Sequence, residues 1–244
     1  MSKPRTLKTL PSFEELVKGK EFVDVSSFDV GWKAFAWSVE RWDVSFLREQ
    51  RDKFFGTRYK KDRAKGTQTY EEVKKSILLG GERIDIDVYD ISSDEKKLDV
   101  QVRLNLFSLL EEKKELWDNT SIVAIEQQFC SSFGKGKKEK SDGTNMDAIK
   151  LSECLMSWFL LKYGDEKCVI FVPTASKTAF LDAPKMPRKL DRKKWVFSQV
   201  LSWAKEKGDA QEQKILETSK VVFDMADSKA QGKAIVFKYI VAAE

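Results

Sequence analysis

Phe28–Trp37 reads FDVGWKAFAW, and the rest of the chain can be interpreted from this segment outward. An apolar run leads into Asp29, Gly31 follows two residues later, and a second apolar run begins at once. Glycine allows the positive φ of a tight hairpin turn, or leaves room for a ligand to approach the backbone. The pattern predicts a β-hairpin with strands over 22–29 and 32–40. Aspartate near glycine is also ordinary turn chemistry, so Asp29 gains meaning only from the rest of the chain.

Two later stretches place acidic residues in comparable positions. Ser121–Phe129 reads SIVAIEQQF, whose small and β-branched residues suit a strand buried on both faces that ends in Glu126. Ligands of open α/β sheets bind at that edge. Val221–Ala230 reads VVFDMADSKA, and on a helix its spacing puts Asp224 and Asp227 on one face. Because two like charges at this spacing destabilise a helix, the pair favours a bound cation.

The amino-acid composition limits the kinds of catalytic and metal site that the chain can form. The 244 residues include no histidine, which excludes histidine-dependent triads, imidazole bases and histidine-ligated zinc sites. The three cysteines are widely spaced, so neither a disulfide framework nor a zinc site is indicated, and a reducing compartment fits. No apolar run approaches the ~20 residues that span a membrane. Any catalysis then depends on carboxylates, lysine, cysteine or a metal.

The remaining elements follow from hydrophobic spacing. Besides the hairpin and the strand that ends in Glu126, we expect the following elements in chain order. They are a short helix over 12–20, an edge strand over 83–91, helices over 98–117 and 146–163, a strand over 168–173, a helix over 195–205, a polar loop over 206–219 and a final helix over 221–240. On the edge strand, Asp85 and Asp87 are expected to face solvent as structural residues. On the 146–163 helix, Ala148, Ser152 and Met156 are candidates for packing against a partner.

Positive charge is concentrated in three stretches: 45–81, the glycine-rich loop Ser131–Gly143, and 185–194. In the loop, the cations are Lys135, Lys137, Lys138 and Lys140. Since the loop comes directly after Glu126, it is well placed to follow a phosphate backbone. The stretches 45–81 and Ser131–Gly143 are also compatible with a solvated charged surface, and that alternative stays open.

Together, Asp29 with Gly31, the IEQQ that contains Glu126, and the D-x-A-D-S of Asp224 and Asp227 resemble the RuvC-like Holliday junction resolvases of the poxvirus and yeast-mitochondrial type, in the RNase H-like superfamily. The resemblance runs from about Phe22 to the C-terminus. It implies an α/β fold, with a mixed five-stranded sheet flanked by helices. The corresponding division is an N-terminal arm over 1–20 and one nuclease domain over 21–244, with insertions at about 45–81 and 206–219. One departure is Phe223, where the family commonly has another aspartate.

The resemblance implies a structure-selective DNA endonuclease that resolves four-way junctions by symmetric, two-metal phosphodiester hydrolysis, as a homodimer that joins through exposed apolar residues of the 146–163 helix. Carboxylates suit Mg²⁺, with Mn²⁺ as a substitute. Asp29 would bridge both ions, Glu126 and Asp224 would each complete one side, and Asp227 would help to place an ion or the water. Lys177, just after a strand, corresponds to the family's active-site lysine and would neutralise charge on the scissile phosphate.

Two alternatives stay open at this point. The same carboxylates would serve an RNase H-like nuclease acting on RNA–DNA hybrids or other branched DNA. The chain is also compatible with a non-catalytic, basic nucleic-acid-binding module whose acidic residues are structural. We expect an intracellular protein with no membrane partner. A viral factory in the host cytoplasm is favoured over the mitochondrion, because Glu14 and Glu15 interrupt an otherwise basic N-terminus.

Overall fold

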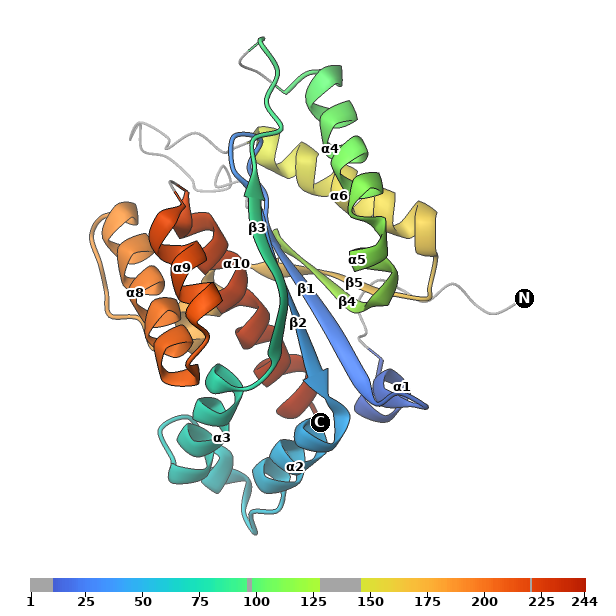
Figure 1. Cartoon of the computed structure of the whole chain (residues 1–244). Coiled ribbons are helices and arrows are strands. Elements are labelled where there is room, and N and C mark those ends of the chain that lie inside the picture. Colours follow the sequence, from blue (N-terminus) through green and yellow to red (C-terminus); the bar gives the residue numbers. More distant parts are fainter. Residues whose placement is uncertain (1–10, 96–97, 128–145, 220) are drawn as a thin grey trace, which may run out of the picture.

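The computed structural model describes residues 11–95, 98–127, 146–219 and 221–244. In this part of the chain, five strands form one mixed sheet with helices on both faces (Figure 1). The strands are β1 (Phe22–Asp29), β2 (Phe35–Asp43), β3 (Glu82–Tyr89), β4 (Thr120–Gln127) and β5 (Cys168–Pro173), in the order β3-β2-β1-β4-β5. Pairing is antiparallel for β1 with β2 and β2 with β3, and parallel for β1 with β4 and β4 with β5. The mixed five-stranded sheet that was predicted is confirmed.

The hairpin between β1 and β2 forms where the sequence predicts it, but residues 30–34 connect the two strands, so β2 begins at Phe35 and not at residue 32 as expected. A Cβ atom added to Gly31 would lie 3.1 Å from the carbonyl oxygen of Ala34, so a side chain there would press on the turn's own backbone. In β1, Phe28 pairs with Ile125 of the parallel strand β4. Because parallel strands end at the same edge of a sheet, Asp29 and Glu126 are brought to one place.

Helices cover each face of the sheet over a separate apolar core. On one face lie α4 (Val100–Glu112), α5 (Lys114–Asn119) and α6 (Met146–Tyr163). On the other lie α1 (Phe13–Val17), α2 (Val44–Phe55), α3 (Gln68–Leu79), α7 (Ala175–Phe180), α8 (Lys189–Lys207), α9 (Ala210–Thr218) and α10 (Val222–Ile235), which continues as a π-helix over Val236–Val241. Within the described ranges, no helix is long and apolar enough to cross a membrane.

Several expectations need correction. The segment 206–219, expected to loop out, contains α9, whose Glu212 is fully buried. Asp85 does not simply face solvent, because it accepts a hydrogen bond of 2.8 Å from the indole nitrogen of Trp37. On α6, the three residues proposed for a partner are buried within the chain itself: Ala148, Ser152 and Met156. That 45–81 and 206–219 are insertions stays a prediction.

The basic segment 45–81 lies at the end of the sheet opposite to Asp29, since α2 begins directly after Asp43, the partner of Phe22. Much of its charge is used within the chain. Arg48 pairs with Glu14, and the Arg51 guanidinium donates to the carbonyl groups of Ile240, Val241 and Ala243. These contacts favour a structural role for this segment. The basic loop Ser131–Gly143 and Cys130 lie outside the described residues.

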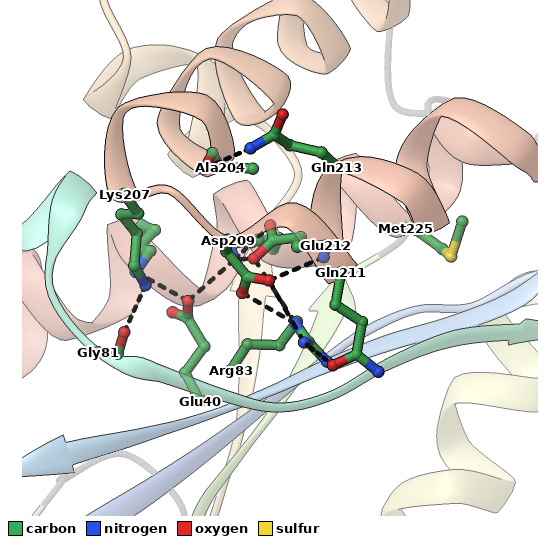
Figure 2. Close-up of polar contacts among 12 residues, drawn as sticks. Glu40, Gly81, Arg83, Ala204, Lys207, Asp209, Gln211, Glu212, Gln213 and Met225 are labelled. Carbon is green, nitrogen blue, oxygen red and sulfur yellow. Dashed lines mark hydrogen bonds and ion pairs between the residues drawn. The ribbon is translucent and has the colours of Figure 1, made fainter.

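Helix α10 is buried along most of its length and carries two lysines with almost no solvent exposure, Lys229 and Lys233. Lys233 Nζ lies 2.8 Å from Glu40 Oε1 on β2 and 2.6 Å from the Gly80 carbonyl oxygen. Lys229 Nζ lies 2.5 Å from Glu212 of α9 and 3.3 Å from Glu40. Figure 2 shows the surrounding acidic and basic groups converging from β2, β3 and α9. The network joins α9 and α10 to the sheet.

Burial lowers the pKa of Lys233 to about 7, although the Glu40 carboxylate opposes this. An unfolded lysine titrates near 10.5, so between pH 7 and 10.5 the unfolded chain binds more protons than the folded one, and stability rises with pH in that window. We expect Lys233→Met to flatten the rise in unfolding free energy between pH 7 and pH 10, measured by urea denaturation. Lys75→Met, an exposed lysine on α3, is the control. Equal pH slopes for wild type and Lys233→Met would contradict the prediction.

Candidate active site

All five residues singled out in the sequence line one pocket of about 550 Å³. Asp29 ends β1, Glu126 lies near the end of β4, Lys177 is in α7, and Asp224 and Asp227 lie in the first turns of α10. The structure therefore brings together every residue of the predicted site. The neighbouring strands supply two carboxylates at one edge of the sheet, and α10 supplies the other pair across from them.

Lys177 holds the floor of this pocket together. Its Nζ lies 3.1 Å from Glu126 Oε1 and 3.1 Å from Asp227 Oδ2, and it is only 4% exposed. The Asp29 carboxyl is hydrogen-bonded to that of Glu126. A buried ammonium group between two buried carboxylates is stable only as a complete set, because each charge would otherwise lack compensation.

The electrostatics differ among the carboxyl groups. Burial and the charge of Glu126 raise the pKa of Asp29 well above its ordinary value. Burial also raises the pKa of Asp227, against the opposing effect of Lys177 and Lys193. At Glu126, burial is outweighed by the charge of Lys177 and by hydrogen bonds from Asp29 and Lys177, so its pKa is lowered. Of the two paired carboxyl groups, Asp29 is therefore the one that takes up a proton first as the pH falls.

Lys193 is a second lysine of the site that sequence reasoning placed only within a basic run. From α8, its ammonium group contacts the Asp224 carboxylate and lies 3.9 Å from Asp227 Oδ2. The available signal was the spacing of Lys189, Arg192 and Lys193, which puts three cations on one helix face. All three line the pocket, and with Trp32 and Lys33 of the β1–β2 turn they form its walls.

The donor chemistry of the pocket suits a hard divalent cation, since four carboxylates line it and Mg²⁺ prefers oxygen ligands. In the described ranges, however, no group of three or more acidic, histidine or cysteine side chains is arranged to hold a metal ion. The ammonium groups of Lys177 and Lys193 neutralise the carboxylates instead. The residue types therefore suit a metal ion, while in this structure the carboxylates form ion pairs with lysine side chains.

Comparison with known proteins gives two matches, both viral. No family model matches the chain. An uncharacterised protein, 97L, of Invertebrate iridescent virus 3 is 27% identical over 192 residues, covering 73% of this chain and 84% of that protein. Among solved structures, the crystal structure of fowlpox virus resolvase with its substrate Holliday junction DNA superposes with a TM-score of 0.51 at 15% identity, covering 88% of this chain and 98% of that chain. The fold is resolvase-like. The fold that the resemblance implies, a mixed five-stranded sheet flanked by helices, is confirmed at this level.

Removing Lys177 tests the ion-paired floor. Lys177→Met would leave Glu126 and Asp227 buried without their cation, and we expect a loss of about 3–5 kcal/mol in unfolding free energy. Adding Asp227→Asn in the same chain should recover part of this loss, because one of the uncompensated charges disappears. Lys33→Met, at the exposed rim of the pocket, should leave stability unchanged. Urea denaturation of the three variants measures these differences, and a fully stable Lys177→Met protein would argue against a structural ion pair.

Proposed function

We propose that the protein is a structure-selective DNA endonuclease that resolves four-way junctions. The observation that carries the proposal is the convergence of Asp29, Glu126, Asp224, Asp227 and Lys177 in one pocket at the sheet edge, on a fold that is resolvase-like. Carboxylates without histidine suit metal-dependent phosphodiester hydrolysis. The crystal structure that the chain resembles holds Holliday junction DNA as substrate, which supports branched DNA as the partner here.

In this proposal the four carboxylates would hold two Mg²⁺ ions, with Mn²⁺ as a substitute, and Asp29 would bridge them. When bound, such ions supply an activated water and stabilise the leaving oxygen. Glu126 and Asp224 would each complete one side of the site, and Asp227 would orient an ion or the water. Lys177, already positioned between Glu126 and Asp227, would neutralise charge on the scissile phosphate. The lowered pKa of Glu126 keeps its carboxyl group ionised beside Lys177.

Asp29→Asn is expected to abolish cleavage and to preserve junction binding. Since burial disfavours the charged form of Asp29 and raises its pKa, a neutral amide of the same shape should leave the fold intact. The assay follows labelled four-way junction, linear duplex and RNA–DNA hybrid, with Mg²⁺ and with chelator. Asp85→Asn, on the distant strand β3, is the control for a lost carboxylate. Undiminished cutting by Asp29→Asn would refute the site assignment.

The same assay separates the alternatives. Symmetric nicks confined to the junction and lost on chelation support the proposal. Cutting of the hybrid alone keeps the carboxylate chemistry and moves the function to an RNase H-like nuclease. Tight junction binding without any cutting favours a non-catalytic binding module. Both similar proteins are viral, which supports a viral protein that acts in a factory in the host cytoplasm.

Resolution of a two-fold symmetric junction needs two cuts, and we propose a homodimer that supplies two sites. The face formed by α4 and α6 supports this, because it exposes large apolar side chains that would be buried between copies. They are Val100, Leu104, Met146, Leu160 and Leu161, the last 89% exposed.

Leu161→Arg should convert a dimer to a monomer, measured by sedimentation velocity over a range of concentrations. A charged side chain within an apolar contact would be desolvated without a partner. Thr218→Arg, exposed on α9 at the other face of the sheet, should leave the mass unchanged. A wild-type protein that stays monomeric at all concentrations would rule out the proposed dimer.

A further inference from the structure

The N-terminal half of α8 presents one face to the pocket. Lys189, Arg192 and Lys193 follow the i, i+3, i+4 spacing of a helix face, and all three line the pocket. Lys193 is held by Asp224 and Asp227. In the part of the chain that the structure describes, neither Lys189 nor Arg192 has an acidic partner. This face therefore combines one cation engaged by the acidic floor with two that are available to a ligand.

The charge balance of the pocket determines which cations can attract an anionic ligand. Its floor carries the four carboxylates, which repel an incoming phosphodiester. Lys177 and Lys193 are the cations that these carboxylates already engage. Attraction of an anionic strand then depends on the cations further out on the walls, among which Lys189 and Arg192 lie together on a single rigid element.

Contacts fix helix α8 at three points along its length. In the N-terminal half Lys193 contacts Asp224 of α10, and at the middle the ring of Phe197 packs edge-on against that of Phe223 in α10, with centroids 5.8 Å apart. At its C-terminal end, Lys207 donates a 2.6 Å hydrogen bond to the Gly81 carbonyl, and Gln213 donates to the Ala204 carbonyl (Figure 2). Side chains on a rigid element lose little conformational entropy when they bind a ligand.

We propose that Lys189 and Arg192 form a phosphate-binding pair for the strand being cut, holding a phosphate adjacent to the scissile one. The inference rests on the proposed function and names a positioning element for its substrate. Arginine binds phosphate through a planar fork of two N–H groups, whereas lysine acts as a mobile point charge. Arg192 then sets the orientation of the strand, and Lys189 adds attraction at the more exposed end of the helix.

The same helix offers matched controls. Lys194 is exposed and does not line the pocket. Arg188 is exposed as well, and its guanidinium is held by Asp191 at 2.8 and 2.9 Å. A general effect of positive charge on α8 would appear in variants of these residues too. An effect confined to Lys189 and Arg192 identifies the pocket-facing side of the helix.

The test is binding of a labelled four-way junction to the full chain, in chelator so that no cleavage occurs, over a series of salt concentrations. We expect Lys189→Ala with Arg192→Ala to lower affinity about tenfold or more. The slope of log affinity against log salt should fall by about 1 for each lost phosphate contact. Arg192→Lys should keep the slope but lose part of the affinity, because charge is retained without the fork. Lys194→Ala should match wild type.

The outcomes separate the inference from the function on which it rests. If wild type binds and cuts the junction and the double variant has the same affinity and slope, the phosphate-binding pair is wrong and the nuclease proposal stands. Equal losses in Lys194→Ala and in the double variant would also overturn the pair, in favour of diffuse attraction. If wild type binds no branched DNA, the proposed function fails, and the pair fails with it. Thermal unfolding confirms that each variant is folded, which we expect because Lys189 is exposed and Arg192 is only half-buried.

Discussion

The parallel pairing of β1 with β4 is the constraint on which the site depends. It brings the ends of two strands that are far apart in the chain to one edge of the sheet, and with them Asp29 and Glu126. Helix α10 packs across β1 and β2 and adds Asp224 and Asp227. Acidic groups gathered in this way repel one another, and Lys177 compensates for that repulsion from α7. The site therefore depends both on the sheet topology that gathers the carboxylates and on the ion pairs that compensate for their charge.

Burial of charge recurs on the face covered by α10. Glu40, Glu212, Lys229 and Lys233 are nearly inaccessible to solvent and bind one another across three elements. Such pairs contribute little net stability compared with apolar residues, yet losing one member is costly. These ion pairs fix the position of α10 on the sheet, because both lysines reach their acidic partners only in that position. That position is also the one in which Asp224 and Asp227 face the ends of β1 and β4.

The sequence predicts those parts of the structure that have a local signal. Apolar alternation and length identify the strands, and the bounds of α6 and β5 agree with the residues expected. Asp29 and Glu126 could be found because each lies at the end of a strand, whereas Lys177 was found through the resemblance to resolvases that carry a lysine just after this strand. Helix α9 was missed because Glu212 reads as a solvated residue, and only its contact with Lys229, from a distant part of the chain, explains its burial. Lys193 was missed for the same reason, since its partners lie on α10.

The two lysines of the pocket have a consequence for how the protein is stabilised. Lys177 and Lys193 serve as internal counterions, so the chain can complete its fold without recruiting an ion from its surroundings. The stability of this edge of the sheet therefore depends on charges that the chain itself supplies.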